Sequence, residues 1–220
     1  MENETSELAT DAEELVFSST TFQEICDELA SKDKDLQLVI ETYGYPPMWT
    51  RPNSFETFVH IILEQQVSLA SALAALTKLR VHTKHVTPEN VLLLTDEEMK
   101  ACYFSKQKMG YARGLASAIV KKDLDLDELV KLPNDTIRKE LKKLKGIGNW
   151  TVDVYLMFVL QRADIFPMGD LAAVNALKKL KKFSTEISAE KIHEVTATWK
   201  PYRTVAAMIL WHYYLSSKAK

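Results

Sequence analysis

The sequence contains little glycine, few cysteines and no long apolar run. Only six of its 220 residues are glycine, well below the ~7% of an average soluble protein, and tight hairpin turns depend on glycine, so an all-β fold is disfavoured. Cys26 and Cys102 are too few and too far apart for a disulfide framework or a cysteine-ligated zinc or iron–sulfur site. No apolar stretch approaches the ~20 residues of a membrane span, and the N-terminus has no signal-peptide core, so we expect an intracellular protein without membrane contact.

The acidic and basic residues are unevenly distributed along the chain. The net charge of −2 by itself argues against a nucleic-acid-binding protein. However, residues 1–41 carry 12 acidic and two basic residues, whereas residues 42–220 carry 26 basic and 18 acidic residues, a charge of +8. Such asymmetry indicates nucleic-acid or membrane contact in some proteins. An acidic solubilising segment followed by an ordinary basic helical surface is the alternative, and charge alone favours that alternative.

Helical periodicity dominates the chain after its first residues. Residues 1–18 are acidic and short of large apolar side chains, which predicts a disordered tail. Residues 19–220 then read as one domain with about ten helices, no internal repeat and no convincing strand. The sequence therefore predicts an all-α fold.

Local patterns mark where individual helices begin and bend. Ser54 precedes a long amphipathic run as its N-cap, and Thr95 opens a capping box. The polar residues Gln65 and Gln66 interrupt the run that follows Ser54. We therefore expect two helices in this region, with a bend between Gln66 and Ser68.

A short turn with two glycines joins two helices in residues 141–160, LKKLKGIGNWTVDVYLMFVL. Gly146 suits the positive φ at which a helix ends, Gly148 has no Cβ to hinder the approach of another backbone, and Ile147 fills the space between the helices. The free N–H groups and the dipole at the start of the second helix favour an anion. The pattern predicts a helix-hairpin-helix element over about residues 135–160 that binds a DNA phosphate without reading sequence. An ordinary helical hairpin with a glycine cap fits the same residues.

Asp170 stands directly before the helical run LAAVNALKKL. Aspartate is a preferred N-cap residue, and that role alone explains its presence. A carboxylate here also suits the cleavage of an N-glycosidic bond, because the reaction develops an oxocarbenium-like cation that a negative charge stabilises, and because a carboxylate helps to activate water. The two roles are compatible, and these residues alone leave both open.

Five segments in a fixed order resemble the helix-hairpin-helix superfamily of DNA glycosylases, in particular its 3-methyladenine DNA glycosylase II branch. They are IILEQQVSLASA (61–72), SKQKMGYARGLASAI (105–119), LKGIGNWTVDVYL (144–156), DIFPMGDLAAVNAL (164–177) and TWKPYRTVAAMILW (198–211). The resemblance covers about residues 20–215 and implies two helical lobes with the active-site cleft between them. It also implies an enzyme that flips a damaged base out of the duplex, because the glycosidic bond is inaccessible in the base stack.

The resemblance assigns roles to the residues that match its motifs. Asp170 falls on the catalytic aspartate, and Gln66 falls on the wedge side chain that fills the gap left by the flipped base. The implied pocket for the extruded base is aromatic and consists of Trp150, Tyr155 and Trp211. Electron-rich aromatic faces suit a cationic alkylated purine through stacking and a cation–π contribution.

The hairpin carries the implied contacts to the DNA backbone. These contacts fall on Lys145, Gly146, Ile147, Gly148 and Thr151. In folds of this kind the hairpin carbonyls often hold a structural alkali ion, so Na⁺ or K⁺ is expected on the carbonyl oxygens of Lys142, Leu144 and Ile147. We expect no catalytic metal and no other cofactor.

Departures from the family pattern narrow the expected activity. Members that also cleave the DNA strand carry a lysine nucleophile after the glycine turn, where this sequence has Trp150. We therefore expect a monofunctional glycosylase without lyase activity, which hydrolyses the N-glycosidic bond of alkylated purines such as 3-methyladenine and 7-methylguanine and leaves an abasic site in base-excision repair. Val154 stands where an aromatic residue is common, which leaves the lesion range open. The alternatives are a non-catalytic helix-hairpin-helix protein that binds damaged DNA and a helical scaffold whose basic face meets an acidic protein.

The implied partner is double-stranded DNA that contains alkylated bases, bound by a monomer. We expect the protein in the cytoplasm or nucleoid of a bacterium, or in the nucleus of a eukaryote. The net charge of −2 does not exclude this partner, because the charge of +8 lies on the residues 42–220 that carry every implied contact.

Overall fold

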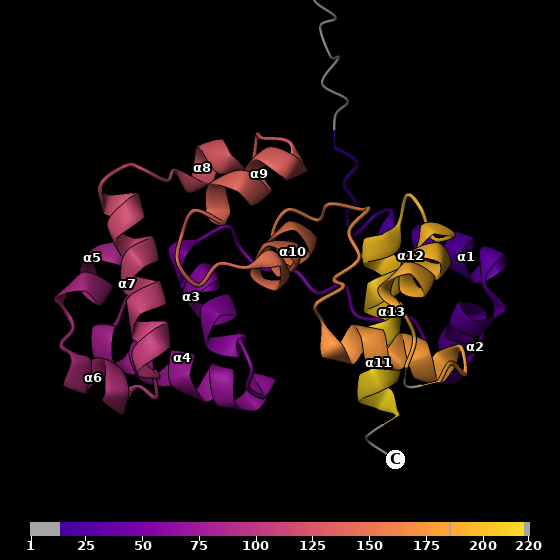
Figure 1. The fold of residues 1–220 in the computed structure, drawn as a ribbon, viewed down its shortest axis with the longest axis horizontal. Helices are drawn as coiled ribbons and strands as arrows, with labels where there is room; N and C mark the ends of the chain where they lie inside the picture. Colours follow the sequence, from indigo (N-terminus) through magenta and orange to yellow (C-terminus); the bar gives the residue numbers. More distant parts are fainter. Residues whose placement is uncertain (1–13, 185, 218–220) are drawn as a thin grey trace, which may run out of the picture.

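The computed structural model describes residues 14–184 and 186–217, which form 13 α-helices and no strand (Figure 1). The helices are α1 (Phe22–Lys32), α2 (Lys34–Tyr43), α3 (Phe55–Glu64), α4 (Leu69–Thr83), α5 (Pro88–Leu93), α6 (Asp96–Ala101), α7 (Lys106–Val120), α8 (Leu126–Leu129), α9 (Asn134–Leu141), α10 (Asn149–Phe158), α11 (Leu171–Leu180), α12 (Ala189–Ala197) and α13 (Arg203–Ser216). The all-α prediction is confirmed. The expected number of about ten was low, and α8, which spans only four residues, has no counterpart among the predicted helices.

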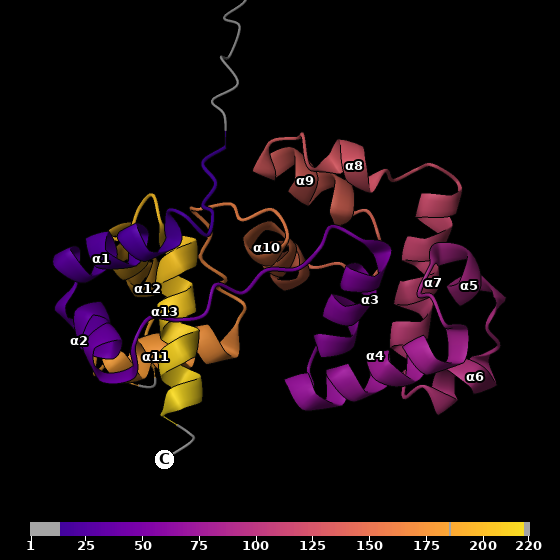
Figure 2. The same cartoon turned by 180° about the vertical axis from the view of Figure 1, so that it is seen from behind.

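The helices form two lobes that lie side by side (Figures 1 and 2). The first lobe contains α3 to α9. The second lobe brings both ends of the described chain together, because α1 and α2 pack against α13, which in turn packs against α11. Helix α10 lies between the lobes and contacts α3 and α9. The connector of residues 44–54 crosses from the second lobe to the first (Figure 2). It is bonded to the end of α10, because the backbone N–H of Arg51 donates to the carbonyl oxygen of Phe158 at 2.8 Å.

Helix ends follow the local patterns in the sequence. The Ser54 hydroxyl accepts from the backbone N–H of Thr57 and caps α3. Thr95 and Glu98 form the expected capping box at the start of α6. Helix α3 ends at Glu64, and α4 begins after Ser68, whose hydroxyl caps it. The predicted bend is therefore a complete break between two helices.

The segment before α1 corrects the predicted domain boundary. Glu14 accepts hydrogen bonds from the backbone N–H and the side-chain Nδ2 of Asn134, at 2.9 and 2.7 Å. Val16 forms an isolated antiparallel bridge with Arg162, and the Phe17 side chain is buried. The expectation of a tail through residue 18 is therefore wrong for residues 14–18, which pack on the domain. The remainder of the expected tail, residues 1–13, lies outside the described residues.

A cluster of polar contacts inside the second lobe joins segments that are distant in sequence. Asp33 caps α2 and accepts from the indole Nε1 of Trp199 at 2.8 Å. The same carboxylate accepts from Lys181 at the end of α11, at 2.6 and 2.7 Å. Trp199 is 1% exposed, which makes it a core residue.

Among the described residues, no helix has the length and hydropathy that a membrane crossing requires.

Candidate active site

Asp170 is the N-cap residue of α11, and its side chain contacts residues of α10 and α13. Its Oδ1 accepts from the backbone N–H of Ala173 at 2.8 Å, so the residue is the predicted N-cap. The preceding residues form a tight turn, in which the Asp170 N–H donates to the carbonyl oxygen of Pro167 at 2.8 Å. Cap and turn together fix the carboxylate at the positive end of the helix dipole, where a negative charge is stabilised.

Two indole rings from other helices donate to this carboxylate. Nε1 of Trp150 on α10 lies 2.9 Å from Oδ2 of Asp170, and Nε1 of Trp211 on α13 lies 3.0 Å from Oδ1. Three residues separated by 20 and 41 positions therefore meet at one point. An ionised carboxylate only accepts hydrogen bonds, and these three donors occupy three of its roughly four lone-pair positions.

Aromatic rings surround the tryptophan on α13. The Phe158 ring lies 5.1 Å from the Trp211 ring, and the Trp49 ring meets it edge-on at 6.4 Å. Arg51 lies over Phe158, with its guanidinium carbon 5.6 Å from the ring centroid, and pairs with Glu64 of α3 through two hydrogen bonds of 2.7 and 2.8 Å. The rings of Trp49, Phe158 and Trp211 are all partly exposed, so they form an aromatic wall beside Asp170.

The glycine turn between α9 and α10 has the conformation that its sequence predicts. Gly146 has a φ of 89°, and a Cβ there would lie 2.1 Å from the ring of Tyr111, so only glycine fits. Ile147 is buried and fills the space under the turn. Gly148 is exposed, and a Cβ there would have no neighbour within 4 Å, so the backbone is open to an external group.

Helix α10 begins at this open backbone. Within the described chain, no side chain caps its N-terminus. The N–H groups in the first turn of a helix have no partner inside the helix, so they bind anions readily. The exposed start of α10 therefore has the geometry that the predicted phosphate contact requires, and the contact itself stays a prediction.

A comparison with protein families identifies this arrangement. The model of the HhH-GPD superfamily, described as base excision DNA repair proteins, matches residues 59–201. The chain belongs to this superfamily. The matched range spans the break between α3 and α4, the glycine turn and Asp170, so the resemblance inferred from five short motifs is confirmed.

Two sequence relatives and one solved structure match this chain over most of their length. The DNA-3-methyladenine glycosylase 1 of Schizosaccharomyces pombe is 29% identical over 206 residues, which cover 90% of this chain and 89% of that protein. The alkylbase DNA glycosidase-like protein mag2 of the same yeast is 27% identical and covers 83% of this chain and 89% of its own. A solved structure of the S. pombe 3-methyladenine DNA glycosylase in complex with abasic DNA has a TM-score of 0.79 at 26% identity, over 86% of this chain and 95% of that one.

The HhH-GPD fold places one expected pocket residue elsewhere. Tyr155 is 0% exposed, stacks on Phe58 at 4.5 Å and donates from its hydroxyl to Oδ1 of Asn53 at 3.0 Å. Burial raises the pKa of this phenol far above its ordinary value. The prediction that Tyr155 lines the base pocket is wrong: α10 turns this side chain into the core, whereas Trp150 on the same helix faces Asp170.

Two of the five residues that were expected to contact the DNA backbone are also buried. Ile147 donates its N–H to the carbonyl oxygen of Leu144 at 3.1 Å, so this group is already used within the turn. Thr151 is 2% exposed, and its hydroxyl accepts from Nε2 of Gln65 at 3.0 Å. These two residues shape the turn from beneath, whereas Lys145 and Gly148 are exposed on it. The side chains of Ile147 and Thr151 therefore support the turn, and a contact of DNA with the Thr151 N–H, in the first turn of α10, stays a prediction.

Gln66 lies on the segment that separates α3 from α4. Its side chain is exposed and its φ is 58°, a left-handed conformation that is uncommon for a residue with a side chain. Val67 and Leu69, its neighbours along the chain, are 46% and 61% exposed. The position suits a side chain that enters DNA, and the wedge role of Gln66 stays a prediction.

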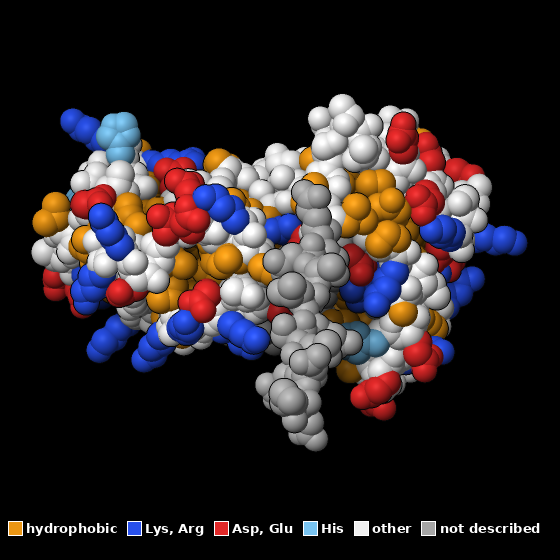
Figure 3. Space-filling view, turned by 90° about the horizontal axis from the view of Figure 1, so that it is seen from above, with side chains coloured by type: hydrophobic (Ala, Val, Ile, Leu, Met, Phe, Trp, Pro, Cys, Tyr) orange, Lys and Arg blue, Asp and Glu red, His pale blue; other side chains and the backbone are white. Residues whose placement is uncertain are grey.

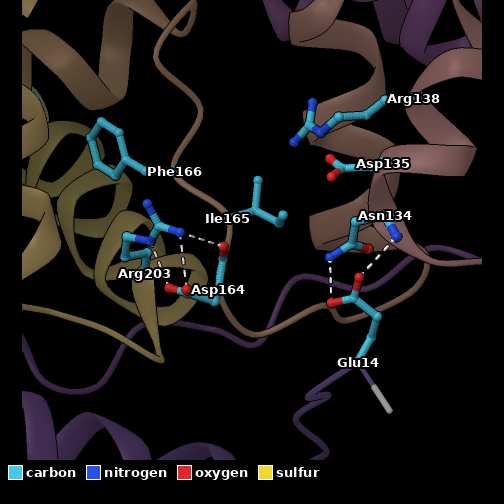
Figure 4. A pocket seen from close by; sticks show the side chains of 8 residues that line it. All are labelled: Glu14, Asn134, Asp135, Arg138, Asp164, Ile165, Phe166 and Arg203. Carbon is cyan, nitrogen blue, oxygen red and sulfur yellow. Dashed lines mark hydrogen bonds and ion pairs between the residues drawn. The ribbon is translucent and has the colours of Figure 1, made fainter. Parts of the chain in front are cut away.

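A polar pocket of about 380 Å³ lies away from Asp170. Figure 4 shows its lining, in which Arg203 pairs with Asp164 and Glu14 pairs with Asn134. None of the residues that surround Asp170 lines it. The face that carries α8 and α9 mixes acidic and basic side chains rather than presenting a uniform basic surface (Figure 3). Both arginines of this polar pocket are already paired, Arg203 with Asp164 and Arg138 with Asp153 outside the lining, so the pocket does not compete with Asp170 as the candidate active site.

Proposed function

We propose that this protein is a monofunctional DNA glycosylase that excises alkylated purines from double-stranded DNA and leaves an abasic site. The observation that carries the proposal is the Asp170 carboxylate, held at the start of α11 by the indoles of Trp150 and Trp211. The names of the relatives support it, since two of them are an alkylbase glycosidase-like protein and a 3-methyladenine glycosylase.

The chemistry of N-glycosidic hydrolysis matches this carboxylate. As the bond to the base breaks, positive charge develops on the sugar, and a fixed negative charge nearby lowers the energy of that state. The flipped base then lies against the aromatic wall of Trp49, Phe158 and Trp211. Such faces attract a cationic alkylated purine through a cation–π contribution.

The hydrogen bonds to Asp170 favour an electrostatic role over proton abstraction from water. A general base needs a free lone pair aimed at the proton that it removes. Ala173, Trp150 and Trp211 already donate to the two oxygens and occupy three of the roughly four lone-pair positions of the carboxylate. We therefore assign Asp170 mainly to stabilisation of the cationic sugar.

The first turn of α10 and Lys145 supply the proposed grip on the DNA backbone. A structural Na⁺ or K⁺ on the carbonyl oxygens of Lys142, Leu144 and Ile147 fits the chemistry of this turn, because alkali ions prefer neutral or anionic oxygen ligands. Leu144 already accepts from the Ile147 N–H and has a second lone pair to offer. Such an ion would add positive charge beside a bound phosphate. We propose no other cofactor.

Release of methylated bases tests the proposed function. Duplex DNA treated with a methylating agent is incubated with the wild type and with Asp170→Asn, and free 3-methyladenine and 7-methylguanine are measured. We expect release and alkali-labile abasic sites with the wild type, and little of either with the variant. A wild type that binds lesions but releases no base would instead be the non-catalytic damage-binding protein. Borohydride trapping of a covalent enzyme–DNA adduct would contradict the monofunctional assignment.

The proposal includes the setting in which the protein acts. We propose that it binds DNA as a monomer, with the first turn of α10 and Asp170 on a single chain. It would act where the genome lies, in the bacterial cytoplasm and nucleoid or in a eukaryotic nucleus. Sedimentation of the protein with and without a duplex measures the stoichiometry directly.

A further inference from the structure

Residues 65–68, which we call the strap, are fastened to the glycine turn by one side chain. Nε2 of Gln65 donates to the carbonyl oxygen of Gly146 at 2.9 Å and to the hydroxyl of Thr151 at 3.0 Å. These two acceptors lie on either side of the exposed start of α10. The contact therefore joins the strap to residues more than 80 positions away along the chain.

We propose that Gln65 is a positioning residue, which couples the strap that carries Gln66 to the phosphate-binding turn. The two elements would then meet DNA as one rigid unit, with the inserted side chain at a fixed distance from the gripped phosphate. The inference rests on the proposed glycosylase function, and it assigns a role in that reaction to a side chain that is itself only partly exposed.

The hydrogen-bonding capacity of the amide matches its two partners. A glutamine amide nitrogen has two hydrogens, and here each has an acceptor, the Gly146 carbonyl and the Thr151 hydroxyl. An ionised glutamate in this place could accept from the Thr151 hydroxyl but would offer no donor to the Gly146 carbonyl, and methionine would offer a donor to neither. Of these side chains of similar length, only glutamine satisfies both groups.

The bond to Gly146 also fixes the orientation of the turn. The same peptide unit carries the N–H of Ile147, which donates to Leu144. Both polar groups of this peptide are therefore bonded, and the backbone that follows, at Gly148, is held in one direction. Because the phosphate is bound by backbone N–H groups, their direction sets where the phosphate lies.

The strap has a second attachment on its other side. Nζ of Lys108 donates to the carbonyl oxygen of Leu63, at 2.8 Å, just before the strap begins. Gln66 follows with its left-handed backbone, a conformation that persists where the surroundings fix it. Gln65 stands directly before this residue, so its two hydrogen bonds restrain the backbone from which the Gln66 side chain projects.

Loss of this coupling should slow catalysis more than it weakens DNA binding. The turn keeps its free N–H groups, so the affinity for undamaged duplex persists. A misplaced wedge or phosphate reduces the fraction of complexes with a correctly flipped base, and displacements of about 1 Å cost up to 100-fold in rate. We expect the single-turnover excision rate of Gln65→Met to fall about 10- to 100-fold.

The experiment uses the full chain and a duplex with one 7-methylguanine beside 2-aminopurine, whose fluorescence reports base flipping. Single-turnover excision, flipping and affinity for the undamaged duplex are measured for wild type, Gln65→Met and Gln66→Ala. Thr151→Val removes one of the two acceptors without changing the size of the side chain, and should cause a smaller loss in the same direction. Gln37→Met is the matched control, because the Gln37 side chain bonds Glu41 on the exposed surface of α2.

The double variant Gln65→Met/Gln66→Ala separates positioning from a merely structural role. If Gln65 acts through Gln66, the double variant excises the base no more slowly than the slower of the two single variants. The flipping amplitude then falls in the double variant and in that single variant. A rate for Gln65→Met equal to that of the wild type overturns the inference, as does additive loss with unchanged flipping. A wild type without any excision refutes the proposed function itself, which is a distinguishable result.

Discussion

Asp170 accepts a hydrogen bond from the indole of Trp211, with Oδ1 and Nε1 3.0 Å apart, although the residues lie on different helices. The same indole ring contacts Phe158 and Trp49. One side chain therefore joins the negative charge of the proposed active site to the aromatic wall of the proposed pocket. A base that contacts this wall is thereby placed near the carboxylate, so recognition and catalysis share a structural element.

Removal of the Asp170 charge should abolish most activity without unfolding the protein. Asparagine is as good an N-cap as aspartate, so Asp170→Asn keeps α11 capped. Loss of a preorganised charge that faces the developing cation typically costs 10²- to 10³-fold in rate, and we expect a loss of about that size. Single-turnover excision of 7-methylguanine measures the rate, and thermal unfolding provides the control. An active variant with more than a tenth of the wild-type rate would contradict the assigned role.

The indole N–H groups should contribute to catalysis separately from their rings. Trp211→Phe and Trp150→Phe each keep an aromatic face and remove one donor to Asp170. A hydrogen bond to a charged group contributes about 1.5–3 kcal/mol, so we expect each variant to lose about 10-fold or more in excision rate. The two losses should not add, because both act on one carboxylate. Retention of full activity by both variants would show that Asp170 needs no such support.

Part of this architecture follows from the sequence because local chemistry determines it. The left-handed backbone at Gly146, the cap at Asp170 and the break before Ser68 each depend on a few neighbouring residues. Tyr155 was assigned wrongly because its direction on α10 depends on which face of the helix meets the core, and a helix that is apolar nearly all round does not reveal this.

Tertiary contacts account for the residues that sequence patterns missed. Trp49 lies in a proline-rich connector with no motif of its own. It reaches the aromatic wall beside Asp170 only because that connector crosses between the lobes. Gln65 was visible as an interruption of a helix, but its acceptors at Gly146 and Thr151 are more than 80 positions away. The ordering of residues 14–18 depends likewise on a distant partner, Asn134.

The two glycines of the turn should respond differently to an added methyl group. Gly146→Ala places a Cβ against the Tyr111 ring and strains a backbone with a φ of 89°, so we expect a loss of more than about 1 kcal/mol in the free energy of unfolding. In Gly148→Ala the added Cβ has no neighbour within 4 Å, and the backbone φ is an ordinary −102°. The free energy of unfolding should therefore hardly change. The added methyl group would instead obstruct a bound phosphate and weaken DNA binding. Thermal unfolding and duplex titration distinguish these effects, and equal unfolding temperatures for the two variants would contradict the structure.

Asp33 should make the second lobe sensitive to acid. Burial acts to raise the pKa of this carboxyl, but hydrogen bonds from Lys181 and Trp199 and the Lys181 charge outweigh burial and lower it below its ordinary value. A lowered pKa in the folded state stabilises the fold above the unfolded-state pKa of about 4, and this contribution is lost as the pH falls through the folded value.

The variant Asp33→Asn tests this dependence. It leaves Lys181 paired with the carboxylate of Asp35. We expect a loss of about 3 kcal/mol at neutral pH, as for other pairs broken on one side. Denaturant unfolding between pH 2 and pH 7 should show a steeper acid-induced loss for the wild type than for the variant. Parallel curves would show that Asp33 does not titrate with a lowered pKa.

Trp49 should select cationic bases over neutral ones. Its ring meets Trp211 edge-on at 6.4 Å and extends the aromatic wall beside Asp170. A cation–π contribution is worth about 0.5–2 kcal/mol, so Trp49→Ala should slow excision of 7-methylguanine or 3-methyladenine about 10-fold. Hypoxanthine is neutral and should lose less. Trp49→Phe keeps a ring and serves as the matched control, with thermal unfolding measured for both variants. An equal loss for neutral and cationic bases would show that Trp49 fills space without attracting charge.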